Sequence, residues 1–223
     1  MLGELLPVNE IFSTMQGEGH YTGTPSTFIR LQGCPVGCPW CDTKYTWPAE
    51  ADKERSLLDI FKKTDATDET YALAEPLDLA ALVAPSPQHV VITGGEPAQY
   101  DLVRLTRQLI RCRHTTQLET SGTFELMVDT RTWVTVSPKV DMPGGLSVKQ
   151  SALKRANEIK HVVGKPADVT ALKSLLADCN PMALVYLQPL SGSRKATALC
   201  IAEAGRNGWK VSIQTHRLLT GVR

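Results

Sequence analysis

Three of the six cysteines in this 223-residue chain stand close together, and this cluster constrains the fold more than any other feature. Cys34, Cys38 and Cys41 are separated by three and two residues, with no fourth cysteine nearby. A structural zinc site closes a tetrahedron with four ligands, and a four-iron cluster usually takes four thiolates. Three thiolates on such a cluster leave one iron open to a small molecule. Gly33 and Gly37, interspersed with prolines, suit a loop that wraps an inorganic core closely.

Two other interpretations of the triplet stay open at this point. Zinc could be bound with a distant fourth ligand such as Cys112 or His20, or the three thiols could be unliganded core residues. The other cysteines, at positions 112, 179 and 200, are single and scattered. That distribution is typical of buried thiols that pack as small hydrophobic groups.

Bulk properties indicate one well-buried domain over residues 1–223. The net charge of +1 favours neither a nucleic-acid nor a membrane surface as a partner. No apolar run approaches the roughly 20 residues that span a bilayer, and the N-terminus lacks a signal-peptide pattern. Six cysteines without a disulfide-like framework predict a reducing, cytoplasmic location.

Apolar runs typical of strands alternate with amphipathic runs typical of helices, which predicts an α/β fold with mostly parallel strands. The chain is short for a full eight-fold barrel of about 250 residues, so we expect a partial TIM-like barrel. The predicted strands are Val8–Phe12, Thr27–Leu31, His89–Thr93, Thr116–Glu119, Trp133–Val136, Glu158–Val163, Leu184–Leu187 and Lys210–Gln214. The predicted helices are Leu77–Ala84, Leu102–Cys112, Lys149–Ala156, Ala167–Ala177 and Ser193–Asn207.

Residues 49–76 break this alternation and are interpreted as a variable insertion. They are rich in Ala, Asp, Glu, Lys and Thr, with one apolar cluster at residues 57–61. We expect an inserted helix followed by a mobile linker. A solvated excursion is favoured over a partner-binding surface.

Polar motifs follow three consecutive predicted strands. Thr93-Gly94-Gly95-Glu96-Pro97 is followed along the chain by Glu119-Thr120-Ser121-Gly122 and Ser137-Pro138-Lys139. Paired glycines let the backbone approach a ligand, and a carboxylate can accept from a hydroxyl or an ammonium group. Ordinary turn chemistry is the alternative for each motif. Together with the cysteine triplet, however, they resemble the signature of radical S-adenosylmethionine (SAM) enzymes, in which SAM occupies the open iron.

Further motifs narrow this resemblance to one family. The pattern FxTxQGEG, then FIRLxGC and CxxCDT, covers residues 12–43. With TGGEP, ETSG, WVTVSPK, EIKH, LQP and QTH it resembles the 7-carboxy-7-deazaguanine synthases over almost the whole chain. A glycyl-radical-enzyme activase is the alternative function, but it would lack QGEG, FIRL, CDT and QTH. A non-enzymatic iron–sulfur or zinc protein would not account for the motifs at successive strand ends.

The family resemblance implies a reaction and its partners. The substrate is 6-carboxy-5,6,7,8-tetrahydropterin, which becomes 7-carboxy-7-deazaguanine by ring contraction and loss of ammonia in queuosine biosynthesis. A reduced 4Fe-4S cluster cleaves SAM to a 5′-deoxyadenosyl radical, which takes hydrogen from C6 of the pterin and later returns it. The enzyme is thus a carbon–nitrogen lyase without a catalytic side chain. The resemblance also implies Mg²⁺, a flavodoxin-like electron donor and a homodimer.

The same resemblance assigns roles residue by residue. An anionic substrate needs a fixed cation, which Arg30 provides as a bidentate guanidinium. Thr43 would bind Mg²⁺ through a hard oxygen, unless its hydroxyl only caps a turn. The cluster is assigned to Cys34, Cys38 and Cys41, the substrate contacts to Gln16, Glu18, Arg30, Thr93, Gln188 and His216, and the SAM contacts to Gly95, Glu96, Ser121, Ser137 and Lys139.

The triplet yields a direct prediction. Replacing Cys34, Cys38 or Cys41 with Ala should abolish reductive SAM cleavage after anaerobic reconstitution, because each thiolate binds a different iron of one cluster. Ala at position 112, 179 or 200 should retain it, and these variants are the controls. Full SAM cleavage by Cys38→Ala would contradict the assignment.

Overall fold

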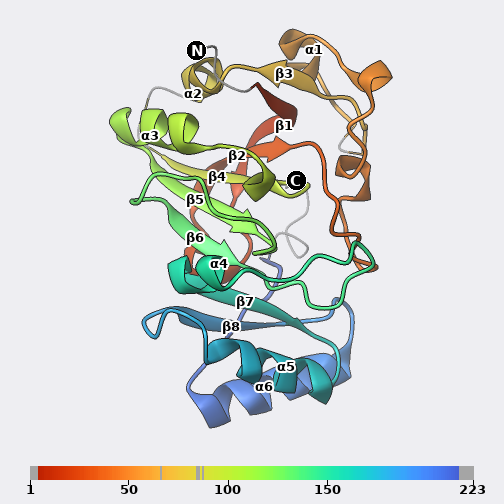
Figure 1. The fold of residues 1–223 in the computed structure, drawn as a ribbon, viewed down its shortest axis with the longest axis vertical. Coiled ribbons are helices and arrows are strands. Elements are labelled where there is room, and N and C mark those ends of the chain that lie inside the picture. Colours follow the sequence, from red (N-terminus) through yellow and green to blue (C-terminus); the bar gives the residue numbers. More distant parts are fainter. Residues whose placement is uncertain (1–4, 66, 84–85, 87, 216–223) are drawn as a thin grey trace.

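The computed structural model describes residues 5–65, 67–83, 86 and 88–215 (Figure 1). Within them, nine strands form one sheet in the order β3-β1-β2-β4-β5-β6-β7-β8-β9. The strands are β1 (Leu6–Met15), β2 (Pro25–Leu31), β3 (Ala72–Ala74), β4 (His89–Gly94), β5 (Thr115–Thr120), β6 (Trp133–Val136), β7 (Glu158–Val163), β8 (Leu184–Pro189) and β9 (Lys210–Val211). The α-helices are α1 (Leu57–Phe61), α2 (Pro76–Leu82), α3 (Val103–Arg111), α4 (Gln150–Arg155), α5 (Pro166–Leu176) and α6 (Arg194–Asn207). Short 3-10 helices are η1 (Gly19–Tyr21), η2 (Lys44–Thr46), η3 (Ala51–Lys53) and η4 (Pro97–Gln99).

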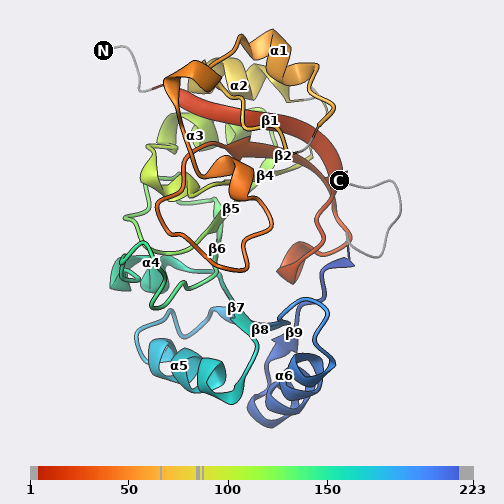
Figure 2. The same ribbon diagram turned by 90° about the vertical axis from the view of Figure 1, so that its right-hand side faces the viewer.

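The sheet is mostly parallel, as the sequence predicts. β2 and β4 to β9 run in one direction, whereas β1 pairs antiparallel with both β2 and β3. The sheet curves, and the larger helices lie along its outer side (Figure 2). The predicted α/β class and partial barrel are therefore confirmed.

Alternate strand residues point to opposite faces of the sheet, and those on its outer face are apolar. Val90 and Ile92 of β4 belong, with Leu118 of β5, to a fully buried cluster that includes Leu105 and Leu109 of α3. A second cluster joins β6, β7 and β8 to α4, α5 and α6. Burying each such side chain stabilises the fold by about 1.5–3 kcal/mol.

The concave face of the same sheet is polar. His89 of β4 contacts Gln117 of β5 (Nε2 to Oε1, 2.9 Å), and Gln117 donates to the Thr135 hydroxyl of β6 (3.0 Å). Gln16, just after β1, donates to the same Gln117 oxygen at 3.2 Å. These buried groups satisfy one another across four strands, so the interior of the partial barrel can hold polar side chains and a cavity.

The segment 49–76 differs from its prediction in its second half. The expected helix is α1, anchored by buried Ile60, but the expected linker ends in edge strand β3. Asn9 of β1 fixes the approach to this strand, since its amide donates to the carbonyls of Asp68 (3.0 Å) and Thr70 (3.1 Å). The segment therefore extends the sheet.

The last predicted strand is also shorter than expected. β9 ends at Val211, and residues 212–215, the C-terminal segment, cross to the loop after β1. The Ser212 hydroxyl accepts from Gly19 N (3.0 Å), and Thr215 N donates to Gly17 O (3.0 Å). After one more bond to β8, from Ser212 N to Leu187 O (2.9 Å), the segment therefore bonds to this distant loop.

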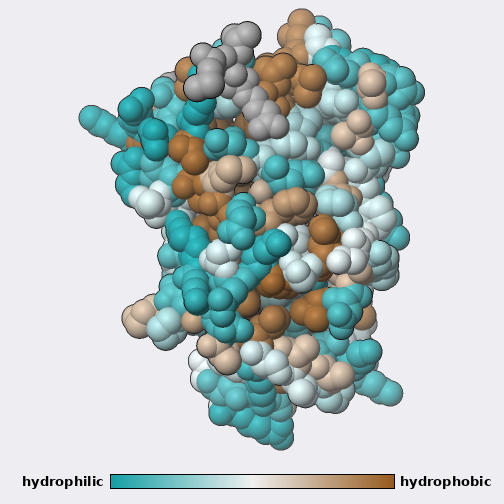
Figure 3. All heavy atoms as spheres, in the orientation of Figure 1, coloured by the Kyte–Doolittle hydropathy of each residue, from teal (hydrophilic) through white to brown (hydrophobic). Residues whose placement is uncertain are grey.

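Exposed apolar side chains gather over α1 and β3 (Figure 3). Leu58, Phe61 and Leu73 are each more than two-fifths exposed. Over the described ranges, no helix combines the length and the apolar character needed to cross a membrane.

The floor of the barrel contains a buried carboxyl group, Glu158, at the start of β7. It is fully buried, and its Oε2 accepts from His20 N at 3.1 Å. Burial, reinforced by the charge of Glu119, raises the pKa of Glu158 to about 7. The folded protein therefore keeps a proton there that the unfolded chain releases at lower pH.

This carboxyl group predicts a pH-dependent stability. Because the pKa is raised on folding, its contribution is fully present below the unfolded value of about 4.5 and is lost as pH rises through about 7. Between pH 4.5 and 7, wild-type stability should fall relative to Glu158→Gln by on the order of 3 kcal/mol. Parallel denaturant titrations of both proteins at several pH values measure this. A pH-independent difference would show that Glu158 titrates normally.

Candidate active site

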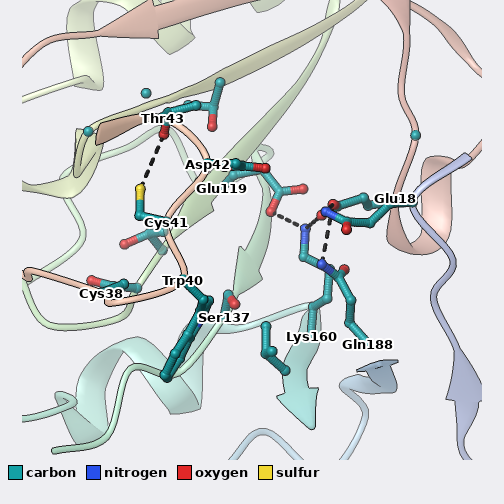
Figure 4. Close-up of a pocket in the computed structure, with 18 of the residues that line it drawn as sticks. Glu18, Cys38, Trp40, Cys41, Asp42, Thr43, Glu119, Ser137, Lys160 and Gln188 are labelled. Carbon is teal, nitrogen blue, oxygen red and sulfur yellow. Dashed lines mark hydrogen bonds and ion pairs between the residues drawn. The ribbon is translucent and has the colours of Figure 1, made fainter. Parts of the chain in front are cut away.

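A cavity of about 330 Å³ lies inside the concave face of the sheet. Its lining residues come from both edges of the barrel: the loops after β2, β4, β5 and β6 at one edge, and the Gly17–Glu18 turn at the other. Because β1 runs antiparallel, the residues that follow it lie at the floor while those following the parallel strands lie at the rim. Figure 4 shows Cys41 and Thr43 on one side of this cavity and Lys160 with Glu18 on the other.

The three clustered cysteines all line this cavity, and none is in a disulfide. Their loop is tied down where Gly33 N donates to Thr46 O (2.7 Å) and where Cys34 N donates to Trp47 O (3.1 Å). Gly33 and Gly37 have φ values of +95° and +72°, which L side chains rarely adopt. The loop conformation therefore depends on glycine at both positions.

The cysteine residues are not gathered around a single metal position. Among the described residues, no group of three or more His, Cys, Asp or Glu side chains could hold one metal ion. A four-iron cluster instead needs each thiolate on a separate iron atom, with the sulfurs spaced around a common space. The three cysteines share one cavity, which leaves such a common space beside them.

The thiols of Cys34 and Cys38 are protonated while they remain unliganded. Burial raises the pKa of the Cys34 thiol to about 11. Burial likewise raises the pKa of Cys38, although the ammonium of Lys139 opposes this shift. Iron binding at these residues therefore has to displace protons.

Thr43 follows the last of these cysteines and begins η2. It occupies the N-cap position, yet its side chain accepts no capping hydrogen bond. The hydroxyl lies 3.5 Å from the Cys41 sulfur and lines the cavity (Figure 4). A purely capping role for this hydroxyl is therefore not supported.

The TGGEP turn after β4 packs directly against the cysteine loop. Gly95 N donates to Leu31 O (2.9 Å), and Glu96 N donates to Gly33 O (2.8 Å). A Cβ added at Gly94 or Gly95 would collide with the backbone of Leu31 or Gly33, respectively. The sequence predicted that the paired glycines let the backbone approach a ligand. In the structure they let it approach the cysteine loop of the protein itself.

The carboxylate of Glu96 is fully engaged within the protein. One oxygen accepts from the Thr120 hydroxyl (2.6 Å) and Ala98 N (2.9 Å), and the other accepts from the backbone and hydroxyl of Ser121. Glu96 is 1% exposed. The structure therefore brings Glu96 and Ser121 together, but they bond to each other as well as lining the cavity.

Ser137 and Lys139 lie in the loop after β6 and also line the cavity. The Lys139 ammonium donates to the Ser137 hydroxyl (2.6 Å) and carbonyl (3.0 Å). Burial lowers the pKa of Lys139, and the neighbouring Cys38 acts in the opposite direction. A partly buried cation next to the cysteine loop favours an anionic ligand at this place.

Two of the predicted substrate residues, Glu18 and Gln188, lie on the side of the cavity opposite Cys41 and Thr43 (Figure 4). Glu18 accepts from Lys160 at one oxygen (2.6 Å) and from Gln214 (2.7 Å) and Gln188 (3.3 Å) at the other. The Gln188 oxygen is buried and has no hydrogen-bond partner within the described residues, although the residue lines the cavity. Such an orphaned acceptor suits a ligand donor.

The other predicted substrate contacts are divided between wall and floor. Gln16, Arg30 and Thr93 line the cavity, and Gln16 Oε1 accepts from Glu18 N at 3.1 Å. Arg30 forms an ion pair with Glu10 through its Nε at 2.6 Å. His216 lies outside the described residues.

The sequence analysis assigned no role to Lys160, Glu119 or Gln214. The Lys160 ammonium bridges Glu18 (2.6 Å) and Glu119 (2.8 Å) in the cavity wall. Although burial alone would lower the pKa of Lys160, the two carboxylates raise it, so the ammonium stays charged. The sequence does contain a signal for Lys160 and Glu119. Charged residues at alternate positions of otherwise apolar strands indicate a polar inward face.

Comparisons with known proteins agree with the site. No protein-family model matches the chain. The chain is 50% identical over 219 residues to the 7-carboxy-7-deazaguanine synthase of Escherichia coli strain K12, covering 96% of this chain and 97% of that protein. It is 42% identical over 217 residues to the enzyme of the same name from Buchnera aphidicola, again with 96% and 97% covered. The crystal structure of QueE from Escherichia coli matches with a TM-score of 0.90 and 48% identity, over 94% of each chain.

Proposed function

The chain belongs to the 7-carboxy-7-deazaguanine synthase family, and from this premise we propose how its residues bind the substrate. The protein is a radical SAM lyase that makes 7-carboxy-7-deazaguanine in queuosine biosynthesis. The predicted alternative, a glycyl-radical-enzyme activase, receives no support from relatives that match over nearly the full chain.

The family brings a 4Fe-4S cluster, SAM and a pterin substrate. We assign the cluster to Cys34, Cys38 and Cys41, which open onto one cavity. When bound, the cluster and SAM would supply the radical that acts on the substrate. We assign SAM to the residues between the cysteine loop and the ends of β4, β5 and β6, namely Gly95, Glu96, Ser121, Ser137 and Lys139.

These SAM-binding residues divide into two kinds. The Lys139 ammonium is a partly buried cation that suits the SAM carboxylate. Glu96 acts chiefly by fixing Ser121 and the end of β5, because its two oxygens already accept four hydrogen bonds. The backbone of the TGGEP turn is then left to meet the amino group of SAM.

The substrate is 6-carboxy-5,6,7,8-tetrahydropterin in our proposal. The observation that carries it is that one cavity has a cation, Arg30, on its wall and an acceptor group around Glu18 and Gln188 on the side opposite Cys41 and Thr43 (Figure 4). Arg30 suits the carboxylate, whereas Glu18, Gln16 and Gln188 suit the guanidine-like edge of the pterin. Thr93 completes the substrate contacts from the end of β4.

Aromatic side chains form part of the cavity wall. The aromatic rings of Phe12 and Phe28 stack at a centroid distance of 5.3 Å, and both line the cavity. Trp40 and Trp47 line it beside the cysteine loop. Excluding water strengthens each charge interaction inside and protects a reactive radical from side reactions.

Several partners rest on the family resemblance alone. We propose a homodimer, a flavodoxin-like electron donor and Mg²⁺ bound by Thr43. We also propose a cytoplasmic location, which is supported by six cysteines that all lack disulfide partners.

Arg30→Ala tests the substrate assignment. Loss of a charge pair in a largely closed pocket costs on the order of 2–5 kcal/mol, so pterin binding should weaken strongly. SAM binding should change little because the SAM carboxylate is assigned to a different cation, Lys139. Anaerobic calorimetry with each ligand, in the absence of a reductant, measures both. Equal weakening of both ligands, or of neither, would count against the assignment.

Thr43 provides a separate test of the magnesium site. Thr43→Ser keeps a hard oxygen donor and should retain stimulation of turnover by Mg²⁺, whereas Thr43→Val keeps the shape and should lose it. Turnover is measured across a magnesium titration, with thermal unfolding as the control for folding. Wild-type stimulation in the Val variant would exclude Thr43 as a ligand.

A further inference from the structure

Glu10 is a buried carboxylate that lies beside the cavity. It is 3% exposed and does not line the cavity, whereas its partner Arg30 does. The two residues face each other across β1 and β2, next to the register shift between positions 8 and 10. The ion pair is short, with Glu10 Oε1 accepting from Arg30 Nε at 2.6 Å.

This ion pair uses only one edge of the guanidinium. Within the described residues, Arg30 donates a single hydrogen bond, from Nε to Glu10. The terminal amino groups therefore remain available to a ligand in the cavity. A guanidinium has five donors in a rigid plane, so fixing it at Nε also fixes the direction in which the terminal groups point.

The aromatic wall restrains the same guanidinium from a second side. The Arg30 carbon Cζ lies 5.4 Å from the centre of the Phe12 ring, and Phe12 stacks on Phe28. A guanidinium over a ring face is attracted by the ring electrons. Glu10 and Phe12 thus hold the arginine between a charge behind it and a ring beside it.

Glu10 also connects this arginine to the cysteine loop. The Tyr45 hydroxyl of η2 donates to the same Glu10 oxygen at 3.4 Å. Tyr45 lies four residues after Cys41, the last cysteine of the triplet. Burial, reinforced by Glu10, raises the pKa of Tyr45 to about 12, although Arg30 opposes the shift, so the hydroxyl remains a donor at neutral pH.

We propose that Glu10 is a positioning residue, which orients Arg30 so that its terminal amino groups meet the substrate carboxylate. The inference rests on the proposed role of Arg30. Without Glu10, a long flexible side chain would have to be ordered each time the substrate binds, and that ordering opposes binding. The same carboxylate keeps Arg30 charge-paired in the empty cavity.

The test combines a change in the protein with a change in the ligand. Binding to the reconstituted holoenzyme is measured anaerobically, with SAM and without reductant, for 6-carboxy-5,6,7,8-tetrahydropterin and for 5,6,7,8-tetrahydropterin, which lacks the carboxylate. Glu10→Gln should weaken binding of the carboxylated pterin about tenfold, because a charge-assisted bond becomes a neutral one. Binding of the carboxylate-free pterin should stay within about twofold, as expected for an effect that acts only through Arg30.

Matched variants separate positioning from a structural effect. Glu10→Ala should weaken binding of the carboxylated pterin more than Glu10→Gln does. If the Ala variant does not fold, the Gln variant alone provides the test. Glu203→Gln removes another ion-paired carboxylate, on α6 beside Lys173 and Arg206, and should leave both ligands unaffected. In turnover, Glu10→Gln should raise KM more than it lowers kcat.

The outcomes distinguish this inference from the assignment of Arg30. If Arg30→Ala does not discriminate between the two pterins, the proposed role of Arg30 fails. If Arg30→Ala discriminates but Glu10→Gln weakens both pterins equally, weakens neither, or tightens the carboxylated one, then only the positioning role of Glu10 is overturned.

Discussion

A single buried ammonium group, that of Lys160, holds together the parts of the protein on which the site depends. It bridges Glu119 of β5 and Glu18 of the loop after β1, across the concave face of the sheet. Desolvating three charges is costly, and their mutual attraction offsets this cost only where geometry and further hydrogen bonds are good. Gln188 and Gln214 provide such bonds to Glu18. With two carboxylates to one cation, the floor keeps an excess of acceptors for a ligand rich in donors.

The rim of the cavity is built on a different principle, the close approach of two backbones. The TGGEP turn donates two amide hydrogens to carbonyls at residues 31 and 33, and neither Gly94 nor Gly95 has space for a side chain. The cysteine loop is therefore fixed to the neighbouring parallel strand before any iron is bound. Charges organise the floor, and steric fit organises the rim. The two ends of the cavity can consequently change independently.

The sequence predicted the regular elements and much of the site. The helix over residues 193–207 was predicted because its residues recur at helical spacing. The structure adds its N-cap, since the Ser193 side chain accepts from Ala196 N. β3 was missed because Ala72–Ala74 has neither the length nor the β-branched residues of a typical strand and depends on pairing with β1. The saturation of Glu96 could not be foreseen, since its partners lie on the next strand, 24 and 25 residues away. Lys160 was missed because only its tertiary neighbours explain a lysine in a buried strand.

The C-terminal segment has a consequence for how the protein is made. The bond from Gln214 to Glu18 spans 196 positions, and Thr215 reaches back to Gly17. A ribosome adds roughly 5–20 residues per second, so Glu18 waits about 10–40 s for this partner. Glu18 and its loop are thus translated early, but they gain these hydrogen-bond partners late. A nascent chain can pair its first strands while the floor of its cavity is still open. Ligand binding that needs this floor therefore begins only once nearly all of the described chain has emerged.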